Sequence, residues 1–466
     1  MTSNKRSQSF VSHAATYAVG NVARRIVGFV MLPIYTRFLT PADYGVVGLL
    51  TFALAVFEPL VGARLGWAIP KFYTDAPDPR SKRTVMWGAI AFTGTVSAVS
   101  VLALILFRGV GSELLFGNRQ YALALGLFSV TLLSQPIEQA GMTYLRLRQR
   151  SRLYLGFSMF KMVLQVGLNL FLVVYLREGV LGVVLSGVTS SVLLGIGTTI
   201  YVALHEAPAF DWQMTRKMVQ FCWPMWLSGL AGLYIGSSGS MYLRVFDSLS
   251  DVGLLSLGFR FAAVTGMLIW SPFFQHWEPM SFQYYREEGG KRKFQVAFIV
   301  MSSLLFAGAL GVSIFSEPVI RVMAAKSFYA AATVVPILAM GFILNNLRQF
   351  FNFSFFVTGN TKIHSLCQYG TAIVITVAYV LLIPRYGLVG AATAQALAFA
   401  INFTYVRLLS RRYFDPGFNL VPLGLYALIG VAAYLCSNVL VKAPSPGLDM
   451  RRPSCGRGPF LGRPDT

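Results

Sequence analysis

The segment 10–39 reads FVSHAATYAVGNVARRIVGFVMLPIYTRFL, an apolar run with Arg24 and Arg25 near its centre. A helix that crosses a bilayer needs about 20 mostly apolar residues, and this run is long enough. Lys5 and Arg6 precede it, as in a signal peptide, but the run is too long for a signal peptide and the two arginines interrupt it. We therefore expect a retained membrane helix that holds two positive charges at depth.

The composition of the whole chain indicates an integral membrane protein. Hydrophobic residues make up 55% of the 466 residues and charged residues only 12%. The mean hydropathy is +0.60. Soluble globular domains carry roughly 25% charged residues, so this chain lies far outside their range.

Apolar runs of spanning length recur along the chain and predict its organisation. Six lie near 13–37, 44–69, 84–107, 121–144, 153–176 and 180–204; six more lie near 218–243, 253–277, 294–316, 330–357, 364–384 and 388–409; a thirteenth covers 420–441. The spacing predicts an all-α polytopic protein with a six-helix bundle over 1–209, a second over 210–414 and an extra helix over 415–441. The Pro- and Arg-rich segment 442–466 is expected to be a disordered, atypical tail.

The net charge of +21 is explained by topology rather than by nucleic-acid binding. Lys and Arg concentrate in the cytoplasmic loops of membrane proteins. With the N-terminus placed in the cytoplasm, the inside segments hold about 20 of the 39 basic residues and the outside loops about eight. We therefore expect a cytoplasmic N-terminus and no nucleic-acid partner.

The two sets of six spans resemble copies, because similar fragments recur 208 residues apart. Asp43-Tyr44-Gly45 matches Asp251-Val252-Gly253, Tyr121 matches Tyr329, and REGVLG at 177–182 matches RYGLVG at 385–390. An even number of spans in each copy gives both copies the same orientation, with an axis along the membrane normal between them. The pattern predicts two parallel repeats around a central cleft.

Three stretches resemble a known family of membrane transporters. They are YAVGNVARRIVGFVMLPIYTRFLTPADYGVVGLL near the start, FCWPMWLSGL at the start of the second half, and VTGNTKIHSL followed by LLIPRYGLVGAATAQALAF. In order and spacing they look like the polysaccharide-exporter, Wzx-type branch of the multidrug/oligosaccharidyl-lipid/polysaccharide (MOP) flippase superfamily. The resemblance covers roughly residues 10–440. It implies transport of a lipid-linked oligosaccharide across a bacterial inner membrane, alongside the polymerase and glycosyltransferases of the same pathway.

Charged side chains inside the spans are the candidate functional residues, because a charge at mid-helix costs about 2.5–3.5 kcal/mol even on lenient insertion scales. Six are basic and only two are acidic. The basic residues are Arg24, Arg25, Arg64, Lys161, Arg260 and Arg348, and the acidic residues are Glu58 and Glu138. Each acid either pairs with a base or couples transport to an ion. Because two acids cannot neutralise six bases, some bases are expected to face water or an anionic ligand.

Polar residues repeat along two of the spans in a way that predicts a cleft surface. Lys161 and Gln165 share one face of the fifth span, and Asn345 shares a face of the tenth span with Arg348. Lipid-facing surfaces reject such stripes. We expect these four residues to bind substrate together with Arg24, Arg25, Arg64 and Arg260.

Three functions are weighed against this pattern. The first is a flippase that moves a polyprenyl-diphosphate-linked oligosaccharide to the outer leaflet for surface polysaccharide assembly. The second is a multidrug cation antiporter of the MATE type, which would require an acidic cavity. The third is a membrane glycosyltransferase, polymerase or ligase, which would require catalytic acids on a large loop. The excess of buried bases and the short connections favour the flippase, with no enzyme activity, no cofactor and no metal site.

Overall fold

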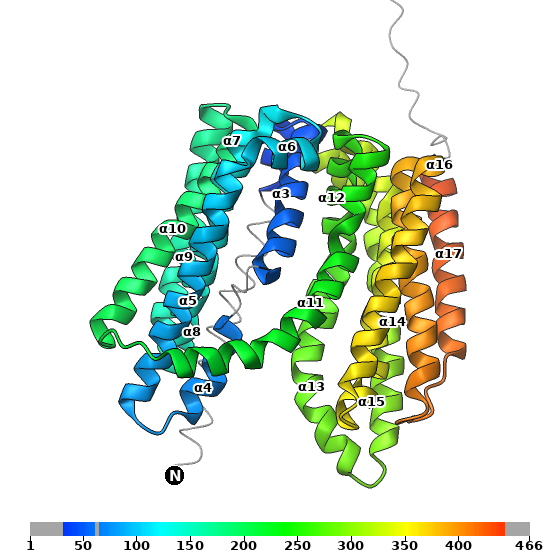
Figure 1. Cartoon of the computed structure of the whole chain (residues 1–466). Helices are drawn as coiled ribbons and strands as arrows, with labels where there is room; N and C mark the ends of the chain where they lie inside the picture. Colours follow the sequence, from blue (N-terminus) through cyan, green and yellow to red (C-terminus); the bar gives the residue numbers. More distant parts are fainter. Residues whose placement is uncertain (1–30, 61–64, 443–466) are drawn as a thin grey trace, which may run out of the picture.

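The computed structural model describes residues 31–60 and 65–442, and these residues form helices joined by short connections (Figure 1). Over these ranges the predicted all-α polytopic fold is confirmed. Eight of the described helical stretches are long and apolar enough to cross a membrane. A further apolar stretch, Val421–Ser437, is shorter. The assignment of twelve spans to two repeats, plus one extra span, stays a prediction.

The first group of helices corresponds to the expected spans of the N-terminal half. Its elements are α2 (Leu32–Phe38), α3 (Pro41–Leu60), η1 (Leu65–Trp67), α4 (Ile69–Asp75), α5 (Pro79–Leu106), α6 (Arg108–Phe116), η2 (Arg119–Tyr121), α7 (Ala122–Ser129), α8 (Thr131–Leu147), α9 (Ser151–Asn169), η3 (Leu170–Tyr175) and α10 (Gly179–His205). The expected span 121–144 is divided at Val130. There the backbone amides of Val130 and Leu133 bond to carbonyls three residues back, which tightens the turn.

The second group contains the helices of the C-terminal half. Its elements are α11 (Trp212–Phe246), α12 (Leu249–Ala262), η4 (Gly266–Trp270), α13 (Ser271–Arg286), α14 (Gly290–Met323), η5 (Lys326–Val334), α15 (Val335–Val357), α16 (Thr361–Ser410) and α17 (Val421–Lys442). The long helix α11 joins the groups. It contacts α5 and η1 of the first group and α16 of the second. Figure 1 shows its start running below the first group before it rises beside α12.

Helix α16 contains a sharp change of direction at Gly387. Its φ of 51° and ψ of −128° are not helical. A positive φ of this size suits glycine, which has no Cβ to clash with the backbone. The break falls between the expected spans 364–384 and 388–409, so α16 holds both. Gly179, which lies 208 residues earlier and begins α10, also has a positive φ of 55°.

Helices α3 and α12 cross each other and bring the two groups together at the upper end in Figure 1. Both begin with the same capping arrangement. Asp43 accepts hydrogen bonds from the backbone nitrogen and the hydroxyl of Thr40, at 3.1 and 2.7 Å. Asp251 accepts one from the Ser248 hydroxyl, which in turn accepts one from the Asp251 amide at 3.1 Å. A reciprocal cap of this kind fixes where each helix starts.

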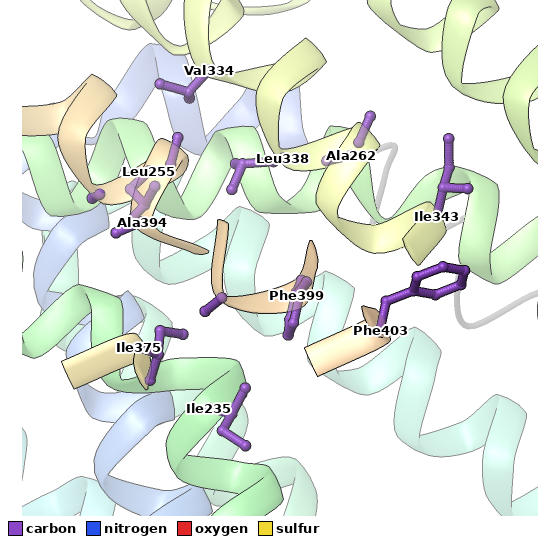
Figure 2. Packing of buried hydrophobic residues seen from close by; sticks show 14 of the residues in the cluster. Ile235, Leu255, Ala262, Val334, Leu338, Ile343, Ile375, Ala394, Phe399 and Phe403 are labelled. Carbon is purple, nitrogen blue, oxygen red and sulfur yellow. The ribbon is translucent and has the colours of Figure 1, made fainter. Parts of the chain in front are cut away.

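The largest hydrophobic core lies among the helices of the second group and extends to α3 (Figure 2). Phe399 and Phe403 of α16 and Ile343 of α15 are among its buried members. Large apolar side chains on other faces are exposed, such as Phe315 at 64% and Leu204 at 78%. Such a pattern suits a protein surrounded by lipid, where outward-facing residues are also apolar.

Candidate functional site

Three of the predicted substrate-binding residues, Arg24, Arg25 and Arg64, lie outside the described residues. Their role stays a prediction. Glu58 lies near the end of α3 and is half-buried. The remaining predicted residues lie at or near three cavities, one between the two groups of helices and one within each group.

The cavity between the groups has a volume of about 200 Å³ and lies below the crossing of α3 and α12. Arg260, in the last turn of α12, brings a positive charge to it. The guanidinium carbon lies 5.3 Å from the ring centroid of Tyr44 on α3, close enough for a cation–π interaction. The polar lining is completed by hydroxyl groups, from Tyr44, Thr51, Ser237, Ser240 and Ser256.

No carboxylate lines this cavity. Among the residues that the structure describes, none forms an ion pair with Arg260. The position of Arg260 at the C-terminal end of a helix favours its positive charge, because the helix dipole is negative there. The arrangement therefore presents an uncompensated cation and several hydroxyl donors to whatever enters the space between the groups.

The first group contains the ion pair between Glu138 of α8 and Lys161 of α9. The Lys161 Nζ lies 2.5 Å from the Glu138 Oε2, and the Ser191 hydroxyl on α10 donates to the same oxygen at 3.0 Å. The predicted pairing of Glu138 is confirmed. Gln165 lies one turn beyond Lys161 on α9 and is half-buried. Because both charges are largely buried, the pair accounts for one of the six intramembrane cations.

Glu138 also lines a cavity of about 570 Å³. Arg146 and Thr143 of α8 line the same cavity, and the Arg146 Nη2 donates to the Thr143 hydroxyl at 2.8 Å. The cavity is bounded on another side by Gly66 and Pro70.

The second group contains a cavity of about 440 Å³ beside Arg348 of α15. The Arg348 side chain is buried, with 8% exposure of the residue. Its Nη1 donates to the Gln368 Oε1 at 3.1 Å, and its Nη2 donates to the Asn345 Oδ1 at 3.2 Å. Asn345 and Arg348 thus share one face of the helix, as the sequence predicts. Within the described ranges, Arg348 has no carboxylate partner at ion-pair distance.

The cavities of the two groups occupy related positions in the chain. Gly66 and Pro70, which line the first, are 208 residues before Phe274 and Glu278, which line the second. In both groups the remaining walls come from two consecutive helices, α8 and α9 in one and α15 and α16 in the other. The 208-residue offset found in the sequence therefore also relates parts of the two cavities.

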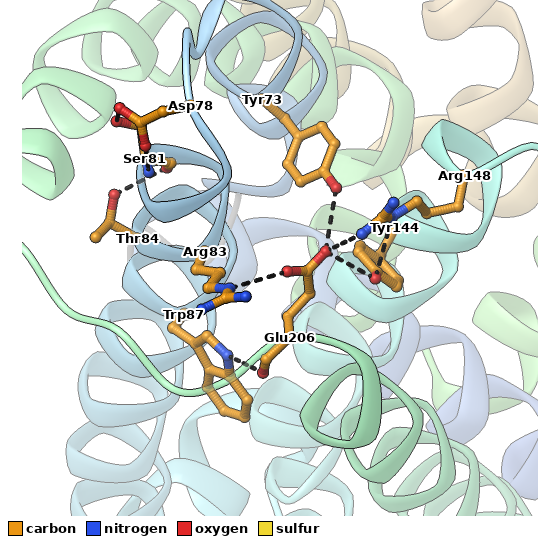
Figure 3. Close-up of polar contacts among 9 residues, drawn as sticks. All are labelled: Tyr73, Asp78, Ser81, Arg83, Thr84, Trp87, Tyr144, Arg148 and Glu206. Carbon is orange, nitrogen blue, oxygen red and sulfur yellow. Dashed lines mark hydrogen bonds and ion pairs between the residues drawn. The ribbon is translucent and has the colours of Figure 1, made fainter.

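A cluster around Glu206 was missed by the sequence interpretation (Figure 3). The Glu206 carboxylate is 4% exposed and accepts hydrogen bonds from the hydroxyls of Tyr144 and Tyr73, at 3.0 and 3.4 Å. Arg148 donates to the same oxygen, and the Arg83 Nε lies 3.5 Å from the other oxygen. An acid in a short polar segment beside several basic loops was the only signal in the sequence.

The charge of Glu206 is held by its neighbours. Burial raises the pKa of Glu206, but the hydrogen bonds from Arg148 and Tyr144 and the charges of Arg148 and Arg83 outweigh it, so the pKa is lowered. The Trp87 indole also donates to the Glu206 carbonyl oxygen at 3.0 Å. The cluster ties α4, α5 and α8 to the end of α10 and has the character of a structural junction.

Comparison with known proteins is consistent with this architecture. The sequence matches the model of the polysaccharide biosynthesis protein family over residues 10–285. Comparison with curated proteins gives no significant match. A similar solved structure is the lipid II flippase MurJ in an inward closed conformation, with 14% identity and a TM-score of 0.69 over 91% of this chain and 98% of that chain.

Two transporters of the MATE type also share the fold. One is a multidrug resistance MATE family transporter of the MOP superfamily in an inward-facing conformation, with 15% identity and a TM-score of 0.66 over 84% of this chain and 95% of that chain. The other is DinF-BH in complex with R6G, with 14% identity and a TM-score of 0.59 over 87% of this chain and 95% of that chain. The expected superfamily is confirmed by family and fold, and the Wzx-type branch stays a prediction. Because the matching residues make up more than half of its length, the chain belongs to the polysaccharide biosynthesis protein family.

Proposed function

We propose that this protein is a flippase that moves a polyprenyl-diphosphate-linked oligosaccharide from the cytoplasmic to the outer leaflet of a bacterial inner membrane. The product would supply surface polysaccharide assembly, such as O-antigen or exopolysaccharide, with the polymerase and glycosyltransferases of the pathway as functional partners. The family description and the fold shared with a lipid II flippase support this substrate class.

The observation that carries the proposal is the chemistry of the cavity around Arg260. A diphosphate offers only acceptor oxygens and negative charge, and the cavity offers a guanidinium and hydroxyl donors without a carboxylate. In a site of low dielectric such an attraction is stronger than in water. A drug cation would meet the opposite sign of charge there. The chemistry of the cavity therefore favours the flippase over the alternative MATE-like antiporter.

The experiment uses the protein's own host, so that the glycan does not have to be known. The chromosomal gene is removed, and the full chain is supplied as wild type or as Arg260→Gln, Arg260→Lys or Arg321→Gln. Arg321 is a matched control, because it is an exposed arginine paired with Glu317 on α14. Surface polysaccharide is measured per unit of folded transporter, and lipid-linked repeat units are assayed in the inner leaflet.

We expect Arg260→Gln to reduce export at least tenfold, as the loss of a charge-assisted contact of about 1.5–3 kcal/mol implies. Arg260→Lys should keep part of the activity because it keeps the charge. Arg321→Gln should behave as wild type. Full export by Arg260→Gln would contradict anion binding at Arg260, and normal surface polysaccharide in the gene-deleted strain would contradict the proposed function itself.

A further inference from the structure

The cavity beside Arg348 differs chemically from the cavity at Arg260. Three buried polar atoms of its lining residues have no hydrogen-bond partner among the described residues, namely the Arg348 Nε, the Asn352 Oδ1 and the His364 Nδ1. A buried polar atom without a partner costs free energy. Three such atoms at one cavity therefore indicate a site that a polar ligand completes.

The kind of ligand follows from the mixture of donors and acceptors. The Arg348 Nε can only donate, whereas the amide of Asn352 can both donate and accept, and so can the ring of His364 in its neutral form. A hydroxyl group also does both, so it suits either orientation of the amide and either tautomer of the imidazole. A polyhydroxylated ligand can thus satisfy all three residues.

A diphosphate fits this cavity less well. Two nitrogens of the Arg348 guanidinium already donate to Gln368 and Asn345, so the charge is partly engaged. The carboxylate of Glu278 also lines the cavity and would repel an anion. Carboxylate and amide oxygens can, however, accept hydrogen bonds from sugar hydroxyls.

The remaining walls suit the apolar faces of a sugar ring. They are aromatic, from Phe274, Trp277, Phe282, Phe353 and Phe356. The volume of about 440 Å³ lies in the usual range of small-ligand sites, which combine apolar walls with a few convergent polar groups. Aromatic walls with mixed donors and acceptors are the chemistry that a carbohydrate requires.

We infer that the cavity beside Arg348 is the glycan subsite, which holds a sugar ring of the lipid-linked oligosaccharide while the diphosphate lies at Arg260. This assignment rests on the proposed function and adds the orientation of the substrate. The sugar hydroxyls pair with the Arg348 Nε, Asn352 and His364. The sugar thus enters the second group of helices, and the charged linkage stays between the groups.

The test captures the substrate inside cells of the host. The photoreactive residue p-benzoylphenylalanine is placed at Phe356 in the Arg348 cavity, at Phe52 in the Arg260 cavity, or at Phe315, an exposed apolar position on α14. After irradiation the full-length protein is purified, and the adducts are fragmented and identified by mass. We expect sugar fragments at Phe356, polyprenyl diphosphate at Phe52 and only phospholipid at Phe315.

A pair of matched substitutions tests the hydrogen bonds. Asn352 and Asn402 are both buried, at 4% and 1% exposure, and the Oδ1 of each lacks a partner among the described residues. Only Asn352 lines the cavity. Both Asn→Leu changes should leave thermal stability unchanged or raised, because each removes an unpaired polar group. Asn352→Leu should lower glycan export roughly tenfold and abolish sugar capture at Phe356, whereas Asn402→Leu should export normally.

The outcomes separate this inference from the proposed function. Sugar captured at Phe52 but not at Phe356, or normal export by a well-folded Asn352→Leu protein, would overturn the glycan subsite and leave the flippase intact. Failure to capture any polyprenyl-linked glycan at either position would overturn both.

Discussion

A Cβ atom placed on Gly45 of α3 would lie 3.0 Å from the backbone nitrogen of Gly253 on α12, and a Cβ atom on Gly253 would lie 3.0 Å from the nitrogen of Gly45. The same atoms would also overlap the Leu249 and Pro41 carbonyl oxygens. The two glycines are 208 residues apart, so the repeated fragments of the sequence meet each other at this crossing. Backbones this close leave no room for a side chain and hold the upper ends of the two groups together.

Gly45→Ala and Gly253→Ala should each force α3 and α12 apart at this crossing. In a helix interior the change from glycine to alanine is otherwise favourable by about 0.8–1 kcal/mol, so any loss reports the contact. We expect export to fall at least tenfold and the reactivity of a cysteine introduced at Ser256 to rise. Gly156→Ala on α9, which meets no atom within 4 Å, is the control and should export normally. Equal behaviour of all three variants would show that close approach at Gly45 is dispensable.

The Glu138–Lys161 pair should be destabilising when only one partner is removed. Lys161→Met leaves a buried carboxylate without its cation, which costs about 3–5 kcal/mol. The double variant Glu138→Gln, Lys161→Met should recover most of the thermal stability of the purified protein, because no buried charge is left unpaired. A double variant as unstable as the sum of the two single variants would mean that the two charges act independently.

The Glu206 cluster should make stability dependent on acid pH. Its pKa in the folded protein is below the ordinary value of 4.5, so the unfolded chain binds the proton more readily. The stabilising contribution is therefore present above the unfolded pKa and is lost as the pH falls through the folded-state pKa. The unfolding temperature of Glu206→Gln, followed from about pH 7 to about pH 3, should be lower at neutral pH and flatter than wild type.

The control for this measurement is Glu113→Gln. Glu113 forms an exposed pair with Arg119, at 58% and 74% side-chain exposure, and such pairs contribute little. Its profile should follow that of wild type. Parallel profiles of wild type and Glu206→Gln would contradict the assignment of acid sensitivity to Glu206.

The topology prediction is tested with reporter fusions after Lys217 and after Lys442. Helix α11 begins at Trp212 at the lower end in Figure 1, and α17 ends at Lys442 at the upper end. With the N-terminus in the cytoplasm, Lys217 should report the cytoplasm and Lys442 the opposite compartment. The same compartment at both positions would mean that α17 does not cross the membrane or that the span count is wrong by one.

Part of this molecule could be predicted from its sequence because the signals are local. Apolar length placed the helices, since a bilayer demands about 20 apolar residues for each span. The spacing of Asn345 and Arg348 placed both on one helix face, where the structure joins them by a hydrogen bond. Glu138 and Lys161 could be paired in advance because they lie at similar depth on consecutive helices.

Other features depended on the tertiary structure, because they join residues that no local pattern relates. The Glu206 carboxylate draws its partners from α4, α5 and α8, with Tyr73 lying 133 residues away in the chain. Repetition marked Gly45 and Gly253 as equivalent, but only the crossing of α3 and α12 brings their backbones into contact. The sequence by itself determined the spans, the charges kept within them and the repeat. Packing decided which charges are paired and which, such as Arg260 and Arg348, face a cavity, because a side chain's neighbours are set by how the helices assemble.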